Sequence, residues 1–385
     1  MNQFLDPARL AALRVGMARR VTAVAALSKR WQAAFASVPR EAFIPAVVWR
    51  DEAGSALEVD RGTDPETWTR MLYNEYCSIV TQLDGGTGTG EGRYTSSSSM
   101  PTVMARMIAE LPDRQGARVL EVGSGTGYNA AVLAARYGAE NVATVEVDAA
   151  LAERADKALV AAGFPAVVAC GDGVDSLPQV LPGARFDALI CTCSIAHLPA
   201  GWLAAVPDGV IVAPWCSGWL PVGVLTLHVR EGDVTGRFKR DFHFMRARAH
   251  RWEAERPVDV TGGRERHGPL SPHRVTYDNE AAAFYVSLCL PGVDYIIDDR
   301  DGLKTLTAWD NADPQSWSVV DWVRTSNEWR VRESGPRSLW AEVEQAYGEW
   351  ARLGEPGVDR YTVRIGDGGV HVTLDGQAVA ELPVT

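Results

Sequence analysis

Three glycines stand at alternate positions after a short apolar run that contains an acid. The run Val119–Val122 carries Glu121, and Gly123, Gly125 and Gly127 follow before a helical pattern begins. Glycine is required where the backbone takes unusual angles or lets a ligand approach closely. The next helix would direct its free amides and positive dipole end at this loop. The pattern predicts a strand, a tight turn and a helix that hold a nucleotide-like cofactor, with a purely structural turn as the alternative.

Polar residues end the later strands that the sequence predicts. Glu146 lies 19 positions after Gly127, an offset from which an acid reaches the ribose hydroxyls of a nucleoside. Asp172, followed by Gly173, either accepts a hydrogen bond from an adenine amine or forms an ordinary turn. Thr192 ends the fourth strand, and ligands of doubly wound sheets lie beyond such strand ends. The four strands are expected over residues 119–122, 141–146, 166–170 and 186–192.

Four consecutive serines, Ser96–Ser99, stand shortly before Pro101. A helix is expected over 102–111, and Pro at an early position suits it, with Ser99 as its N-cap. Capping is therefore one use of these serines. The other is a set of hydroxyls, Ser98 and Ser99 among them, that line a site.

Composition excludes several classes of protein. The chain has 385 residues and a formal net charge of −11, which argues against an electrostatic nucleic-acid binder. No run of about 18 apolar residues occurs, so no membrane span is expected. The start of the sequence lacks a secretory signal, which predicts a cytoplasmic protein. The six scattered cysteines are expected to be reduced core residues, and their spacing predicts no metal site.

Pattern and composition divide the chain into four expected parts. Residues 1–75 form a helical or lid segment, and 76–252 form a core in which strands and helices alternate. Residues 253–272 are a linker rich in Pro, Gly and charge. Residues 273–385 form a small α+β domain whose tryptophans are either core or a binding platform. The basic stretch 237–251 is either a solvated strand face or a dock for an acidic partner.

Several motifs resemble those of protein-L-isoaspartate O-methyltransferases. Residues 38–45, Val-Pro-Arg-Glu-Ala-Phe-Ile-Pro, are similar to the family's VPRExFVP. The Ser-Met-Pro at 99–101 is similar to its S-x-P helix entrance, and 119–128 to its VLEIGSGSGY. The resemblance extends over residues 38–247. It implies an α/β fold, namely the doubly wound sheet of class I S-adenosylmethionine-dependent methyltransferases, with an N-terminal helical segment and a small C-terminal α+β domain.

The resemblance also implies roles for the site residues. Glu146 would bind the ribose of S-adenosylmethionine and Asp172 the adenine, and Ser99 would lie beside the transferred methyl and the substrate carboxylate. The product would be S-adenosylhomocysteine, and no metal is expected. The implied catalytic residues are Ser98 and Ser99, and the implied cofactor residues are Glu121, Gly123, Ser124, Gly125, Gly127, Tyr128, Glu146, Asp172, Gly173 and Thr192.

Three departures from the family pattern bear on the substrate. The segment after the serine, 100–103, differs from the family's Pro-His-Met, the glycine-rich 84–93 replaces a compact loop, and 273–385 is an extension. The whole chain resembles actinobacterial methyltransferases that act on ribosomally made peptides, including graspetides and lanthipeptides. In those systems a methylated Asp closes to a succinimide (aspartimide).

We therefore expect an S-adenosylmethionine-dependent O-methyltransferase that esterifies an Asp side chain in a constrained, ribosomally made peptide. Its partner would be that modified precursor peptide, with no nucleic acid or membrane involved. Generic protein-L-isoaspartate repair is the alternative. A third hypothesis is a binding protein that retains the cofactor fold without catalysis. His197, after the fourth strand, either orients substrate or packs as an ordinary polar residue. The sequence makes no prediction of oligomeric state.

Overall fold

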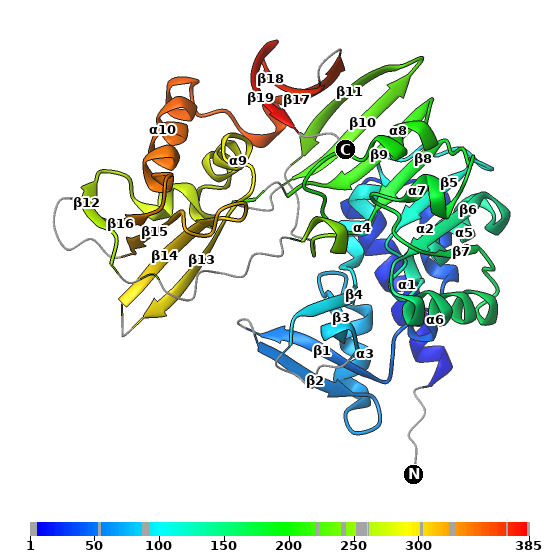
Figure 1. Ribbon diagram of the computed structural model, residues 1–385. Helices are drawn as coiled ribbons and strands as arrows, with labels where there is room; N and C mark the ends of the chain where they lie inside the picture. The colour runs from blue at the N-terminus through cyan, green and yellow to red at the C-terminus, as the bar shows by residue number, and fades with distance from the viewer. Residues whose placement is uncertain are drawn as a thin grey trace. The chain divides into compact units, whose positions relative to one another are not determined.

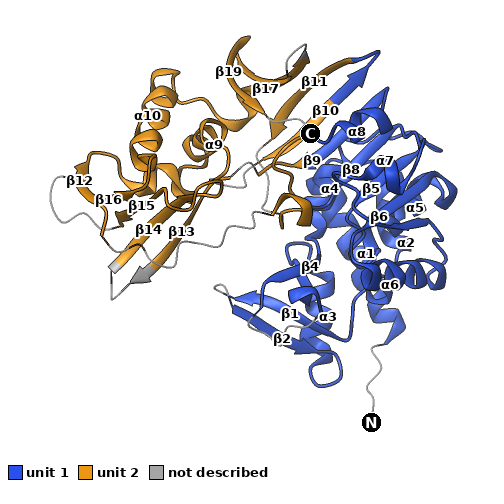
Figure 2. Cartoon of the chain, in the orientation of Figure 1, with its two compact units in different colours: residues 1–193, 199–213, 228–232 blue, residues 194–198, 214–227, 233–385 orange. Residues whose placement is uncertain are grey.

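The computed structural model divides into two compact units, each of which gathers segments from distant parts of the sequence (Figure 2). Unit 1 comprises residues 1–193, 199–213 and 228–232, and unit 2 comprises residues 194–198, 214–227 and 233–385. The residues that the structure describes are 6–52, 55–86, 92–216, 218–219, 223–239, 244–251, 260, 262–300, 303–322, 328–366 and 369–382.

This division differs from the four predicted parts because of strand pairing. Strand β11 (Asp233–Lys239), expected in the core, pairs antiparallel with β17 (Tyr361–Gly366) near the end of the chain. Both strands consequently belong to unit 2. The expected linker, 253–272, contains strand β12 (Arg264–Gly268), which pairs with β16 (Trp329–Ser334). That part of the linker prediction is wrong.

Unit 1 contains the predicted parallel sheet. Its strands lie in the order β9, β8, β5, β6, β7, and each neighbouring pair is parallel. Every residue of β5, β6 and β8 is buried, as expected for central strands of a sheet covered on both faces. The bounds are β5 Val119–Val122, β6 Val142–Glu146, β7 Val167–Cys170, β8 Ala188–Cys191 and β9 Gly209–Pro214.

Helices connect these strands in the βαβ pattern that the alternation predicts (Figure 1). Helix α5 follows the glycine loop, and the N-terminal end of α6 is capped by Asp148, whose side chain accepts from the amides of Ala150 and Leu151. The helices are α5 Tyr128–Tyr137, α6 Ala149–Ala161, α7 Leu177–Val180 and α8 Ala200–Ala205.

The N-terminal part of unit 1 contains the expected helices and an antiparallel sheet with strand order β2, β1, β3, β4. Helix α4 begins at Pro101, but its N-cap is Met100 and no side chain caps it, so the prediction of Ser99 as N-cap is wrong. Instead, the serines up to Ser98 extend β4. The elements are α1 Pro7–Val24, α2 Lys29–Ser37, β1 Val47–Glu52, β2 Ser55–Asp60, α3 Pro65–Tyr73, β3 Ile79–Leu83, β4 Tyr94–Ser98 and α4 Pro101–Ile108.

Unit 2 contains two antiparallel arrangements of strands. The first has the order β12, β16, β15, β14, β13, and the second joins β11, β17, β18 and β19. Strand β10 (Val224–Arg230) runs through the division between the units. The remaining elements are α9 Glu280–Cys289, β13 Val293–Arg300, β14 Leu303–Asp310, β15 Trp317–Asp321, α10 Leu339–Arg352, β18 Gly369–Leu374 and β19 Gln377–Leu382.

Tryptophan burial supports the interpretation of these residues as core. Trp309, Trp317, Trp340 and Trp350 are buried in unit 2, because each ring can remove a large apolar area from water. Trp322 and Trp329 are only half-buried. The expected hairpin at the end of the chain is confirmed by the pairing of β17 with β18, although residues 367 and 368 of its turn lie outside the described residues.

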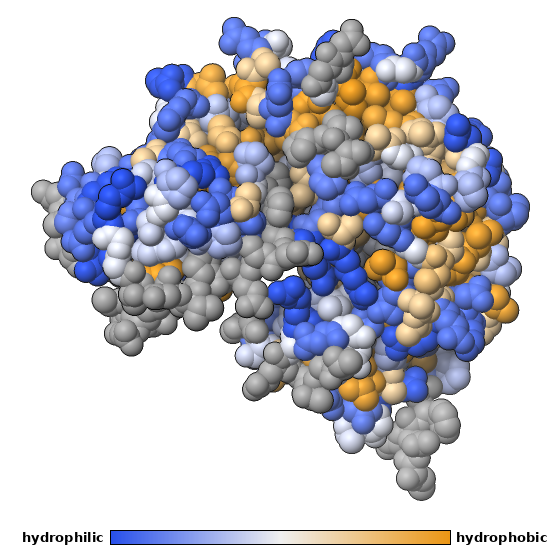
Figure 3. Space-filling model, in the orientation of Figure 1, coloured by the Kyte–Doolittle hydropathy of each residue, from blue (hydrophilic) through white to orange (hydrophobic). Residues whose placement is uncertain are grey.

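The surface and the cysteines complete the comparison with the predictions. On the face drawn in Figure 3, apolar residues form separate patches among hydrophilic ones. Among the described residues, none of the helices has the length and apolar character that crossing a membrane requires. All six cysteines are free thiols, but only Cys191 and Cys216 are buried and Cys170 is exposed, so the prediction of mainly core cysteines is wrong.

Candidate cofactor and substrate site

The loop after β5 takes the conformation that its glycines permit. Gly123, Gly125 and Gly127 have φ angles of +94°, +53° and +85°, a region that other residues rarely adopt. A Cβ atom at Gly123 would lie 2.4 Å from Oγ1 of Thr192. Backbone angle and available space both require glycine at position 123, which confirms the predicted tight turn.

Glu121 is a fully buried carboxylate at the floor of this loop. It accepts hydrogen bonds from Nδ2 of Asn129 at 2.7 Å and from Oγ1 of Thr144 at 2.6 Å. The Thr144 hydroxyl lies 2.6 Å from Oγ of Ser124, and because Thr144 donates to Glu121, Ser124 is the donor in that pair. Burial raises the pKa of Glu121 to about 7, although the two hydrogen bonds to the carboxylate lower it. A neighbouring cation would favour its ionised form.

Glu146 and Asp172 lie at the strand ends where they were expected. The Glu146 carboxylate accepts from the amide of Gly125 at 2.8 Å and from that of Asp148 at 3.1 Å, which ties the end of β6 to the glycine loop. The Asp172 carboxylate accepts from the amide of Val174 at 2.9 Å, the contact of an ordinary turn. Their roles toward ribose and adenine stay predictions.

A narrow cleft of about 30 Å³ opens beside the loop. Seven of the predicted site residues line it, namely Ser98, Ser99, Glu121, Gly123, Ser124, Tyr128 and Thr192. Four lining residues were not predicted, namely Ser97, Met104, Thr126 and Asn129. Five predicted residues lie outside the lining, namely Gly125, Gly127, Glu146, Asp172 and Gly173.

The two predicted catalytic serines differ in their hydrogen bonds. The hydroxyl of Ser98 is buried and accepts from Nη2 of Arg40 at 3.0 Å. The hydroxyl of Ser99 makes no hydrogen bond with any described residue, whereas its carbonyl oxygen accepts from the same nitrogen at 3.1 Å. Arg40 thus holds the backbone of this turn and leaves the Ser99 hydroxyl available to a ligand in the cleft.

Arg40 does not line the cleft but contacts two of its serines, and sequence reasoning assigned it no role. Its side chain is fully buried, donates to the carbonyl of Leu72 at 2.7 Å and lies over the Tyr128 ring at 5.3 Å from the ring centroid. No described carboxylate forms an ion pair with it. Burial lowers the pKa of Arg40, since the charged form loses hydration. Its position in the Val-Pro-Arg-Glu motif was the only sign in the sequence that Arg40 has a role. Its contacts with Ser98 and Ser99, which lie 58 and 59 positions later in the chain, could be seen only in the fold.

His197 belongs to unit 2 and packs against another histidine. Its ring centroid lies 3.6 Å from that of His250, whose Nδ1 accepts from the amide of Ala196 at 2.9 Å. This contact supports the packing interpretation of His197.

The parallel sheet, with a glycine loop after β5 and an acid at the end of β6, has the arrangement of the class I S-adenosylmethionine-dependent methyltransferase fold. Residues 89–217 match the family model "Protein-L-isoaspartate(D-aspartate) O-methyltransferase (PCMT)". This match covers 129 of the 385 residues.

Curated relatives carry the name protein-L-isoaspartate O-methyltransferase. The relative from Ignicoccus hospitalis is 36% identical over 153 residues, which are 39% of this chain and 65% of the relative. The relative from Gloeobacter violaceus is 34% identical over 43% of this chain and 64% of its own length. The relative from Thermotoga maritima is 33% identical over 31% of this chain and 37% of its own length. The chain thus spans less than two thirds of these relatives.

One solved structure, named protein-L-isoaspartate O-methyltransferase, is similar over 94% of this chain and 99% of its own, with 20% identity and a TM-score of 0.54. That likeness shows the fold. Residues 273–385 are about 29% of the chain, so this coverage includes most of them. The fold of this region therefore has a counterpart in that one solved structure, which we did not expect of an extension.

Proposed function

We propose that this chain is an S-adenosylmethionine-dependent O-methyltransferase that esterifies an aspartyl or isoaspartyl carboxylate in a peptide or protein. The family match of residues 89–217 carries the proposal. The cleft supports it, since Glu121, the glycine loop and Ser99 meet there.

The chemistry of the cleft residues suits the cofactor. Glu121 would face the ammonium group of the methionine moiety, and the missing side chain of Gly123 lets Thr192 approach the loop closely. Glu146 would hold the ribose and Asp172 the adenine. When bound, the cofactor supplies an activated methyl group on a sulfonium centre. The glycine loop and Glu121 hold that end of the cofactor in place.

The substrate carboxylate needs alignment more than deprotonation. Aspartyl carboxyls have a pKa of about 4 and are ionised near pH 7. The Ser99 hydroxyl would donate to one carboxylate oxygen and leave the other to attack. Arg40 acts as a positioning residue, because it fixes the backbone of Ser98 and Ser99 and places a buried positive charge behind them. The ring of Tyr128 and the methyl group of Met104 would help to exclude water.

The finer proposal concerns the substrate. A constrained, ribosomally made peptide of the graspetide or lanthipeptide type would be methylated on an Asp in the cytoplasm. The amide nitrogen of the next residue then attacks the ester carbonyl, loses its proton, and methanol leaves as the succinimide closes. The departures at residues 100–103 from the family pattern support this proposal. Generic isoaspartyl repair is the second candidate, and the names of the relatives favour it.

Incubation with S-adenosylmethionine and three peptides tests these proposals. The peptides are an isoaspartyl model peptide, its aspartyl twin and a cyclised peptide of the graspetide or lanthipeptide type that contains Asp. Methyl esterification of any of them supports the general proposal. Strong preference for the isoaspartyl peptide favours repair, and methylation followed by loss of methanol from the cyclised peptide favours tailoring. If no peptide is methylated and calorimetry detects no S-adenosylhomocysteine binding, the general proposal is wrong and the non-catalytic hypothesis returns.

A further inference from the structure

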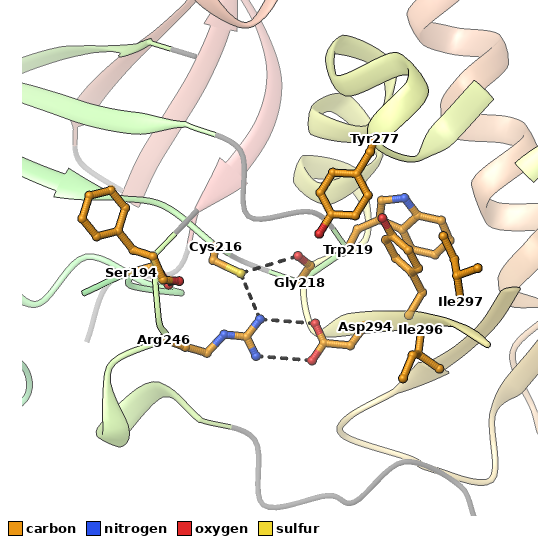
Figure 4. A pocket seen from close by; sticks show the side chains of 11 residues that line it. Ser194, Cys216, Gly218, Trp219, Arg246, Tyr277, Asp294, Ile296 and Ile297 are labelled. Atoms are coloured by element: carbon orange, nitrogen blue, oxygen red, sulfur yellow. Dashed lines mark hydrogen bonds and ion pairs between the residues drawn. The ribbon is translucent and has the colours of Figure 1, made fainter. Parts of the chain in front are cut away.

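Unit 2 contains a cavity of about 460 Å³ that the proposed reaction does not use. Figure 4 shows the rings of Trp219 and Tyr277 on one side and an ion pair between Arg246 and Asp294 on the other. The cavity also touches strand β13, the last strand in the order of its five-stranded sheet. Because β13 pairs only with β14 among the described strands, its other edge is an outer edge of that sheet.

The cavity follows that outer edge. Four consecutive residues, Asp294, Tyr295, Ile296 and Ile297, line it. Successive side chains of a strand point to opposite faces of the sheet. A cavity in contact with all four must therefore run along the edge of the strand, where backbone groups are within reach.

One observed hydrogen bond shows which residues of β13 direct their backbone N–H and C=O groups to this edge. The carbonyl of Val293 accepts from the amide of Trp219 at 2.6 Å, on the side away from β14. In an antiparallel ladder, alternate residues direct both backbone groups to the same side. Tyr295 and Ile297 share the parity of Val293, so their N–H and C=O groups face the outer edge. No described residue pairs with these groups.

The side chains that line the cavity favour an uncharged side chain as its occupant. Arg246 donates to both Asp294 oxygens, at 3.2 and 3.3 Å, and its Nη2 also donates to Sγ of Cys216 at 3.0 Å. The ion pair balances its own charge. Trp219 and Tyr295 form an aromatic wall with ring centroids 4.9 Å apart, and the buried Tyr295 hydroxyl has no hydrogen-bond partner among the described residues. Aromatic walls bury apolar and aromatic side chains well.

We propose that an extended segment of the peptide substrate adds to the outer edge of β13 as a further strand and inserts an aromatic or branched apolar side chain into this cavity. The occupant is a peptide because only another extended backbone matches alternating donors and acceptors along a strand edge. The identity of the occupant as substrate rests on the proposed function.

The test compares two tyrosines that are both 54% exposed, Tyr277 at the cavity and Tyr76 in unit 1. The probes are two end-blocked isoaspartyl peptides that differ in one extended segment, which carries Tyr and Val in one peptide and Gly and Ser in the other. Tyr277→Ala is expected to raise KM for the Tyr/Val peptide roughly tenfold, the value of one aromatic contact, with kcat within about twofold. The Gly/Ser peptide and the Tyr76→Ala variant are expected to show no change. Tyr295→Phe, which keeps the ring, should raise KM less.

Hydrogen exchange without cofactor separates this proposal from the proposed function. The Tyr/Val peptide is expected to protect the amides of Tyr295 and Ile297. Protection without any methylation supports the β13 site and contradicts the proposed activity. Methylation with unchanged KM in Tyr277→Ala and no protection of these amides overturns the β13 site. Protection that rises with protein concentration in the absence of peptide also overturns it, because a second copy of the chain then occupies the edge.

Discussion

The cleft of unit 1 and the cavity of unit 2 are built in opposite ways. All cleft residues except Thr192 fall within residues 97–129, and a single glycine loop with its flanking strand supplies many of them. The cavity draws residues from separate stretches between Ser194 and Ile297. The cleft is narrow, polar and densely hydrogen-bonded, whereas the cavity is wider and has four aromatic residues among the eleven that line it.

This difference indicates two tasks. A short loop with a buried carboxylate suits a small ligand whose charge and shape do not vary, since the same atoms must be met each time. A strand edge with an aromatic pocket suits a longer ligand recognised mainly through its backbone. If this division holds, changes in the cleft should affect cofactor binding and turnover, and changes at β13 should affect peptide KM alone.

The largest effect is expected from Gly123→Ala. The positive φ and the 2.4 Å approach to Thr192 would force the loop to move, which should weaken S-adenosylhomocysteine binding on the order of 100-fold. Calorimetry measures this. Gly163→Ala is the matched control, because Gly163 also has a positive φ, +83°, but nothing within 4 Å. Equal loss of binding in both variants would show that general strain, and not the cleft, is responsible.

Arg40→Met should lower the free energy of unfolding by about 3 kcal/mol, because the buried oxygens that it serves would lose their donor. Denaturant unfolding measures the loss. Arg136→Met is the control, since Arg136 is equally buried but pairs with Asp113 away from the cleft. Only the Arg40 variant should also lower kcat, measured at denaturant concentrations at which both variants are fully folded. If the two variants keep the same kcat, Arg40 does not position the serines.

Ser99→Ala should reduce kcat/KM roughly 30-fold, the value of one hydrogen bond to a charged group. Binding of S-adenosylhomocysteine should be unchanged, because the hydroxyl is assigned to the substrate. Ser97→Ala, in the same run, is expected to change turnover little. A loss of cofactor affinity in Ser99→Ala would instead assign this serine to the cofactor.

The smallest effect is a pH dependence of cofactor binding. Because the pKa of Glu121 is raised to about 7 by burial, S-adenosylhomocysteine affinity should rise roughly tenfold between about pH 6 and pH 7.5 as the carboxylate ionises. In the absence of ligand, the free energy of unfolding depends on pH with the opposite sign, because the protonated form of Glu121 favours folding. The folded protein holds the proton more tightly than the unfolded chain, so this contribution is full below the ordinary pKa of 4.5 and is lost as the pH rises through about 7. Glu121→Gln should remove both dependences, and calorimetry with thermal unfolding at several pH values would detect any that persist.

Local patterns were sufficient for much of unit 1. Alternating glycines at 123–127 predict a loop that only glycine can form, and the observed φ angles agree. The apolar runs that become β5, β6 and β8 are fully buried, so their hydrophobicity identified them. The acid at 146 lies at the loop because parallel strands in register end at the same edge of the sheet.

The serine run shows where local rules failed. Capping preference favoured Ser99 as an N-cap, but the serines continue strand β4, which pairs with β3 and is held by Arg40. Capping rules weigh only neighbours in sequence, whereas pairing with β3 satisfies the backbone of the run from a distance. Sequence pattern also did not decide whether the basic stretch 237–251 is a solvated strand face or a dock for an acidic partner. One of its members, Arg246, is paired with Asp294, and residues 240–243 lie outside the described part of the chain.

The sequence by itself determined the glycine loop, the parallel strands and the acids at their ends, because these depend on backbone geometry and periodicity over a few residues. Only the tertiary structure decided the contacts of Arg40, the division into units and the cavity beside β13. The long-range hydrogen bonds and the β11–β17 pairing involved join residues separated by about 30 positions or more. Ordinary residue types such as Arg, Tyr and Ile acquire these roles only through the neighbours that folding brings to them.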